Sequence, residues 1–159
     1  MLTYSITDMG IEKDIHQESF RNDFHRAYVN LFYTYGWLME RVKKTLSKSD
    51  ITPQQYNILR ILRGSHPTPL STLQIRDRML DKMSDTSRIV DRLVAKNLVS
   101  KKTNDNDKRL VDVTITESGL ELLVAMDEKN DELDSILENL NIEEAIQLNN
   151  MLDKIREKK

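Results

Sequence analysis

Basic side chains gather in the middle of this sequence, where they could bind phosphate groups. Residues 70–110 contain ten Lys and Arg residues against six Asp and Glu residues, a local charge of +4. Residues 111–159 contain five basic and thirteen acidic residues, a local charge of -8, so the net charge of -2 conceals a basic centre and an acidic end. Because a partner's phosphates respond to the face that they approach, the local charge bears more on polyanion binding than the total does.

Arg88 stands in a stretch, "SDTSRIVDRLVAKN", whose apolar residues have helical spacing. An α-helix fits the major groove of DNA, and its first turn presents side chains to base edges. We expect Arg88 to contact a guanine or a phosphate; the alternative is a surface arginine paired with Asp85 or Asp91. Asp85 either specifies a base or caps its own helix, and capping is favoured. The expected DNA-contacting residues of this turn are Ser84, Thr86, Ser87 and Arg88.

A second basic group stands in "NDNDKRLVDVTIT", residues 104–116. The flanking runs "LVSKKT" and "RLVDVTIT" predict a β-hairpin, with Asn and Asp at its tip because they tolerate turn geometry. A long tip would insert Arg109 into a minor groove, with Asp107 bracing it through a bidentate contact. The alternative is a turn salt bridge with no partner. Lys101, Lys102 and Lys108 are expected to add phosphate attraction.

Four helices are predicted ahead of this hairpin. Apolar spacing predicts a long amphipathic helix from Phe20 to near Ser49, after a weakly patterned segment, residues 1–12. Thr52 and Pro53 begin the next helix, and Gly64 suits a left-handed turn at its end. Ser71 and Gln74 form a capping box for a helix over about 72–80. Ser84 is expected to cap the fourth helix, which Asn97 closes with a positive φ.

Two acidic helices are predicted after the hairpin, one from Thr116 or Ser118 to about Leu140 and one from Glu143 to about Glu157. The fold class is therefore mainly helical with a small β wing: a winged helix-turn-helix at 52–116, with the helix-turn-helix at about 71–97 and the wing at about 98–116. A single domain, 1–159, is expected. The terminal segments 1–48 and 117–159 carry more apolar surface than this small core can cover, which predicts a homodimer.

The residues themselves resemble the MarR family of transcriptional regulators. The resemblance rests on "SDTSRIVDRLVAKNLV", which is similar to the family's recognition helix, and on "NDNDKRLVDVTITESG", which is similar to its wing and contains the Asp-any-Arg motif as residues 107–109. It implies a homodimer that holds two winged helices over consecutive major grooves of double-stranded DNA. It also implies repression of genes, with release from DNA by a small, often phenolic, effector.

Arg76 departs from that resemblance, because the family usually has a small residue at this position. We expect Arg76 either to snorkel out of the helix-turn-helix or to reach a phosphate. Among the aromatic residues, Tyr33 and Trp37 lie one helical turn apart and are the candidate effector contacts. Core packing or a dimer interface is the commoner role of aromatic residues at this spacing.

Other chemistries are disfavoured. The chain has no cysteine, and His16, His25 and His66 lack the spacing of metal ligands, so neither a thiol switch nor a metal site is expected. The absence of a phosphate-binding glycine loop or a nucleophile motif argues against an enzyme, and no cofactor is expected. Short apolar runs predict a cytoplasmic protein without membrane segments. The remaining alternative is a winged-helix dimer that acts as a protein-interaction adaptor through its acidic terminal helices.

Overall fold

The computed structural model describes residues 10–104, 107–128 and 130–157. Residues 1–9 of the weakly patterned N-terminal segment and residues 105–106 of the hairpin tip lie outside these ranges. The chain divides into two compact units, Met1–Val42 and Lys43–Lys159, and each is considered by itself. Among the described residues, no helix combines the length and the apolar character needed to cross a membrane.

The first unit consists of α1 (Ile11–Asp14) and most of α2 (Asp23–Ser47), which confirms the long predicted helix. Arg26 Nε donates to Glu12 Oε1 at 2.6 Å, and this hydrogen bond lowers the pKa of Glu12 and raises that of Arg26. Along α2, the rings of Tyr28 and Phe32 meet edge to face with centroids 6.0 Å apart. Phe24 and Phe32 are nevertheless largely exposed, so this aromatic face has no cover within the unit.

The second unit contains the predicted helix-turn-helix, formed by α4 (Thr72–Arg78) and α5 (Thr86–Ala95), with α3 (Pro53–Ser65) packed against both. Thr52 caps α3 and forms a capping box with Gln55, and the predicted box of Ser71 and Gln74 begins α4. Each box satisfies backbone N–H groups that the first helical turn leaves without partners. Asn97 closes α5 with φ 57, as predicted.

Three boundary predictions are wrong. Gly64 is part of α3, and no described glycine lies in the left-handed region; His66 is the C-cap instead. Helix α4 ends at Arg78 rather than Leu80. Helix α5 is capped by Asp85 rather than Ser84, because the Ser84 hydroxyl is engaged with Asp81.

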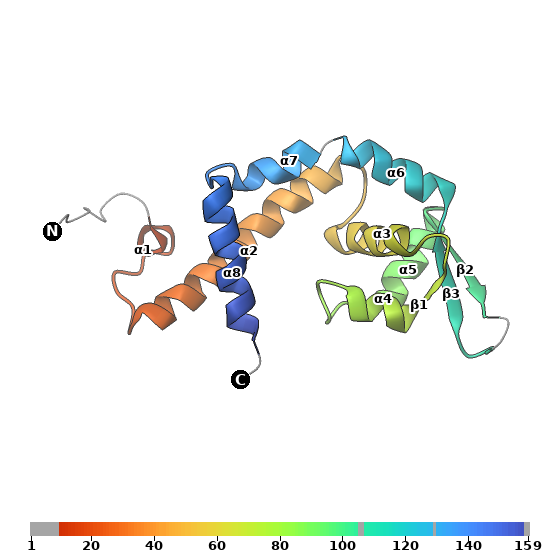
Figure 1. Cartoon of the computed structure of the whole chain (residues 1–159), viewed down its shortest axis with the longest axis horizontal. Coiled ribbons are helices and arrows are strands. Elements are labelled where there is room, and N and C mark those ends of the chain that lie inside the picture. Colours follow the sequence, from red (N-terminus) through yellow and green to blue (C-terminus); the bar gives the residue numbers. More distant parts are fainter. Residues whose placement is uncertain (1–9, 105–106, 129, 158–159) are drawn as a thin grey trace. The chain divides into compact units, whose positions relative to one another are not determined.

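The predicted hairpin is formed by β2 (Val99–Thr103) and β3 (Val111–Ile115), which pair antiparallel with Val99 opposite Ile115 and Thr103 opposite Val111. A short strand, β1 (Leu70–Ser71), pairs with the other edge of β3, which gives the order β1-β3-β2. The sequence did not predict β1, because two residues after a proline carry no strand periodicity. Figure 1 shows the hairpin extending away from the helices α3 to α5.

One apolar core holds these helices and the sheet together. Helix α3 contributes three fully buried residues, which lie among residues of α4, α5 and β3 that are equally inaccessible. Such a core fixes the position of α5 and of the hairpin base, since close-packed side chains resist displacement. The central buried residues are Ile58, Leu59, Leu62, Ile75, Val90, Leu93 and Val113.

The long helix predicted to reach Leu140 is interrupted. Helix α6 spans Glu117–Asp127, followed by α7 (Asn130–Asp134), a short 3-10 turn (Ser135–Leu137) and α8 (Ile142–Arg156). Residues 127–134 include five acidic residues and a single apolar one, Leu133. Acidic residues oppose the dipole at a helix C-terminus but favour it at an N-terminus, so this composition suits the start of a new helix.

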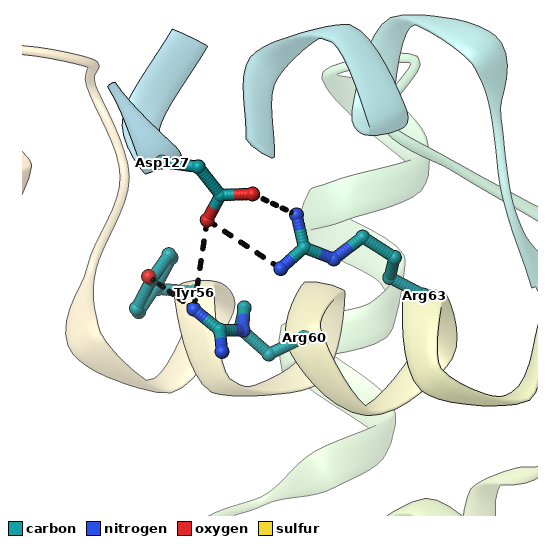
Figure 2. Close-up of polar contacts among 4 residues, drawn as sticks. All are labelled: Tyr56, Arg60, Arg63 and Asp127. Atoms are coloured by element: carbon teal, nitrogen blue, oxygen red, sulfur yellow. Dashed lines mark hydrogen bonds and ion pairs between the residues drawn. The ribbon is translucent and has the colours of Figure 1, made fainter. Parts of the chain in front are cut away.

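Helix α6 is fixed at both ends. At its N-terminus, Gly119 lies so close to the hairpin base that an added Cβ would stand 2.3 Å from the Leu98 carbonyl oxygen. At its C-terminus, Asp127 Oδ2 accepts a hydrogen bond of 2.5 Å from Arg63 Nη1 on α3, and Arg60 Nη1 lies 3.7 Å from Oδ1. Arg60 also donates to the Tyr56 hydroxyl at 2.9 Å (Figure 2). Helix α6 is therefore tied both to the hairpin base and to α3.

Candidate nucleic-acid interface

Helix α5 presents one polar face to solvent and packs its other face against the core. Val90 and Leu93 are buried, whereas Ser87, Arg88 and Arg92 are exposed. The helix begins at Asp85, whose Oδ1 accepts the backbone N–H of Arg88 at 3.2 Å. This confirms the expected capping role of Asp85. The cap also draws the carboxylate back toward the helix N-terminus, where the helix dipole stabilises its charge.

Two of the residues expected to contact DNA are not displayed in this way. Thr86 is only 5% exposed, and its hydroxyl faces the sulfur of Met79 at 3.3 Å, so its side chain belongs to the core. Thr86 is therefore not a candidate for contact with DNA. Ser84 lies ahead of the helix cap, and its hydroxyl donates to Asp81 Oδ2 at 2.6 Å. Ser84 thus organises the turn before α5.

The Arg88 guanidinium has no ion pair within the described part of the chain. Both carboxylates expected to neutralise it are engaged elsewhere: Asp85 caps the helix, and Asp91 Oδ1 binds Lys101 Nζ at 2.8 Å. Lys101, which was expected to contact phosphate, therefore joins the first strand of the hairpin to α5. Arg92, one helical turn beyond Arg88, is exposed as well. The four-residue spacing of Arg88 and Arg92 is the sequence signal that indicates Arg92 as a further candidate on the same helix face.

Side chains beside the hairpin tip hold the described backbone on either side of residues 105–106. Asp107 Oδ1 accepts the backbone N–H of Arg109 at 2.9 Å, and Asn104 Oδ1 accepts that of Asp107 at 2.9 Å. Asn104 also donates from its side-chain amide to both carboxylate oxygens of Asp112, at 2.9 and 3.0 Å. Asp107 thus holds the backbone at Arg109, in place of the bidentate side-chain contact that was expected.

Three cations of the hairpin remain available to a partner. Lys102, Lys108 and Arg109 are exposed, and none forms an ion pair with another described residue. Asp107 bonds the Arg109 backbone, and the Arg109 side chain is exposed. The described part of the hairpin therefore combines a fixed base, side-chain bonds to the backbone at Asp107 and Arg109, and three exposed cations without an ion pair to another described residue.

The turn between α4 and α5 contains two apolar residues whose exposure is not predicted from the sequence. Leu80 is 89% exposed and Met83 is 93% exposed, although both lie in a hydrogen-bonded turn. Asp81 organises this turn by accepting from the Ser84 hydroxyl and, at 3.0 Å, from the Met83 backbone N–H. The same two bonds hold the pKa of the Asp81 carboxyl below its ordinary value. No periodicity distinguishes these exposed residues from the buried Met79.

Arg76 is exposed and its neighbour Ile75 is fully buried, so the arginine does not enter the core of the helix-turn-helix. It lies on α4 as one more cation of the same unit. Among the residues that the structure describes, no three His, Cys, Asp or Glu side chains gather in a way that could hold a metal ion.

The candidate effector residues lie in the first unit. Tyr33 is 40% exposed, and the Arg41 guanidinium lies 3.7 Å from the centroid of the partly buried Trp37 ring. One face of the indole is therefore covered by a cation. A shallow depression lies instead along one side of α6, and it is lined by Glu117, Leu120, Glu121, Val124, Ala125 and Glu128.

Comparison with known proteins gives consistent matches. The sequence profile of the MarR family matches residues 51–111. Among characterised proteins, the chain is 26% identical over 131 residues to the HTH-type transcriptional regulator MhqR of Bacillus subtilis, covering 82% of this chain and 89% of MhqR. It is 32% identical over 76 residues to the HTH-type transcriptional repressor MdtR of the same organism, of which it spans about half (48%).

Solved structures extend the match to most of the chain. A mutant of Escherichia coli MarR complexed with operator DNA has a TM-score of 0.77 at 22% identity, with 88% of this chain and 100% of that chain covered, and so shares the fold. The crystal structure of a MarR transcription factor from Planctomyces limnophilus has a TM-score of 0.67 at 32% identity, with 85% of this chain and 98% of that chain covered. With 32% identity across nearly the whole of this relative, the chain belongs to the MarR family of winged helix-turn-helix transcriptional regulators.

Proposed function

We propose that this DNA-binding regulator is a sequence-specific repressor that acts as a homodimer on double-stranded DNA. The observation that carries the proposal is the pair of exposed arginines, Arg88 on α5 and Arg109 on the wing, whose guanidinium groups are not neutralised by the described carboxylates around them. Each arginine stands on a backbone that is fixed by a carboxylate cap or brace. Preorganised cations of this kind bind an anionic partner without first breaking an internal pair.

The two arginines suit different parts of a DNA duplex. Arg88 lies in the first turn of a helix of the size that the major groove admits, where arginine binds guanine O6 and N7 through two hydrogen bonds. Arg109 lies at the tip of a hairpin, a position suited to a narrow minor groove whose negative potential attracts arginine. Ser87 is the remaining polar candidate on α5, and Lys102 and Lys108 supply phosphate contacts.

The homodimer is supported by the apolar surface of the terminal helices. None of the residues of α8 is buried, and four of its large apolar residues are more than half exposed: Ile142, Ile146, Met151 and Ile155. An isolated helix of this length is marginal in water, so α8 needs a covering surface for its stability. A second copy of the chain supplies such a surface, and symmetric pairing is the commonest solution.

Repression is supported by the similarity to MdtR, a transcriptional repressor, and operator binding by the similarity to E. coli MarR, whose complex with operator DNA has been solved. A small aromatic effector, contacting Tyr33 and Trp37, remains part of the proposal. With Arg41 above the indole, a ligand that carries a carboxylate beside its ring would meet both a cation and an aromatic edge. A cytoplasmic location is part of the same proposal, since the operator is there.

The test measures binding of the purified protein to duplexes selected from a random library, across a range of salt concentrations. Arg109→Ala should weaken binding to all duplexes and lower the salt slope by about 1, because one phosphate-linked cation is lost. Arg88→Ala should reduce the preference for the selected duplex by roughly 1–3 kcal/mol. Arg21→Ala removes the same charge from an exposed site in the first unit and should leave both properties unchanged.

The rival function is a protein-interaction adaptor, favoured by the charge of -8 over residues 111–159. An adaptor would show no preference for any duplex, and neither arginine substitution would change its weak, salt-sensitive binding. If both variants bind the selected duplex as the parent does, the roles given to α5 and the wing are wrong.

A further inference from the structure

The turn between α4 and α5 displays an apolar side chain at an unusual place. Met83 is 93% exposed and lies two residues ahead of Asp85, the cap of the recognition helix. In a flexible loop, such a side chain could fold back onto the protein surface, but this turn is held in place by several hydrogen bonds. Asp81 accepts from the Met83 backbone and the Ser84 hydroxyl, and Asn57 on α3 accepts the Leu80 N–H at 2.9 Å. The position of Met83 is therefore built into the fold.

The surroundings of Met83 indicate the chemistry of its partner. Arg88, which forms no ion pair with a described residue, lies on the first turn of α5, within the segment that carries a local charge of +4, whereas the Lys82 ammonium donates to the Asp77 carbonyl oxygen. The carboxylate of Asp81 is engaged within the turn, where it accepts hydrogen bonds from the Met83 backbone N–H and the Ser84 hydroxyl. An exposed apolar side chain ahead of the unpaired Arg88 fits a polyanion that also offers apolar groups. In the major groove of DNA, that group is the 5-methyl of thymine.

We propose that Met83 is a specificity-determining residue that contacts a thymine 5-methyl group in the major groove, beside the bases reached by Arg88. The inference rests on the proposed function, because it places the turn and α5 in the same groove. The thioether is unbranched and polarisable, so it can follow the shape of a methyl group and its neighbouring sugar. Burying it there removes apolar surface that the free protein leaves in water.

The experiment replaces thymine by deoxyuridine in the selected duplex, which removes only the methyl groups. The wild-type protein should bind the deoxyuridine duplex about fourfold more weakly for each methyl that it contacts, the factor corresponding to one buried CH₂. Met83→Gln keeps the length of the side chain but not its apolar end, and it should bind the two duplexes equally well. Met83→Leu, which stays apolar, should retain the discrimination.

Leu80→Gln is the matched control, because Leu80 is almost as exposed in the same turn but three residues further from α5. It should keep the wild-type ratio of the two affinities. Because the affinity ratio of each variant is compared with that of the wild type, changes in duplex flexibility on removing methyl groups, which affect every protein equally, cancel. Thermal melts should show all three variants folded, since the substituted side chains make few internal contacts.

The two levels of failure are separate. If the wild-type protein selects no preferred duplex, the proposed function fails and the inference falls with it. If a duplex is preferred but Met83→Gln discriminates between thymine and deoxyuridine as the wild type does, or Leu80→Gln abolishes the discrimination equally, the assignment of Met83 is overturned and the proposed function stands.

Discussion

Asp85 shows how one side chain can decide both the stability of α5 and the electrostatics of the helix end that the proposed function places against DNA. Its carboxylate accepts the Arg88 backbone N–H at the start of α5. An anion at this point stabilises the helix dipole but repels the phosphates of an approaching duplex. The cap therefore favours folding at some expense to non-specific DNA affinity.

Asp85→Asn separates these effects. Asparagine caps helices about as well as aspartate, so the free energy of unfolding should change by only a few tenths of a kcal/mol, whereas Asp85→Ala should lower it by about 1 kcal/mol. Affinity for all duplexes should rise in Asp85→Asn, since a negative charge is lost, with the same preferred sequence. Urea unfolding and binding titrations give both quantities. A changed preferred sequence would mean that Asp85 reads a base.

At the scale of elements, the junction of α6 with the hairpin base depends on a glycine. An added Cβ at Gly119 would lie 2.3 Å from the Leu98 carbonyl oxygen and 2.7 Å from Ile115 Cγ1. The same carbonyl accepts the Thr116 N–H at 3.1 Å, so it cannot retreat freely. The helix and the hairpin are therefore in backbone contact at the point where the wing begins.

Gly119→Ala should lower the free energy of unfolding by about 1–3 kcal/mol, because the overlap forces backbone apart. Gly64→Ala is the matched control, because Gly64 lies within α3 and an added Cβ would have nothing within 4 Å. This substitution should raise the free energy of unfolding by about 0.5–1 kcal/mol. Thermal and urea unfolding of the two variants should thus shift in opposite directions. Equal stabilisation of both would show that α6 stands off the hairpin.

At the scale of the whole molecule, the exposed apolar residues of α8 and the aromatic face of α2 require cover that neither unit supplies by itself. The acidic charge of the C-terminal third disfavours close approach to DNA, so this part of the chain suits association away from the duplex. These properties underlie the proposed homodimer.

Sedimentation of the wild-type chain should give twice the 18.6 kDa mass of a single copy. Ile146→Glu combined with Ile155→Glu should dissociate the dimer, because each places a charge in an apolar interface. Gln147→Glu adds the same charge to an exposed polar position of α8 and should leave the dimer intact. A monomeric wild type would contradict the assembly, as would a double variant that stays dimeric.

The sequence by itself determined the local structure. Periodicity and capping pairs such as Ser71 with Gln74 identified the helices, and the turn-forming residues at 104–107 identified the hairpin, because these signals depend on neighbours within a few residues. The prediction of one uninterrupted helix to Leu140 was wrong. The apolar spacing is helical on both sides of residues 127–134, but the acidic residues there disfavour continuation of the first helix.

Only the tertiary structure decided which side chains are available for chemistry. Thr86, Ser87 and Arg88 are adjacent in sequence, yet Thr86 packs against Met79 while the other two face solvent. Lys101 forms an ion pair with Asp91, ten residues earlier, whereas the Arg88 guanidinium pairs with neither Asp85 nor Asp91. The exposure of Met83 and the contact at Gly119 likewise depend on elements brought together by the core. Burial and ion pairing are properties of spatial neighbours, which local sequence signals do not specify.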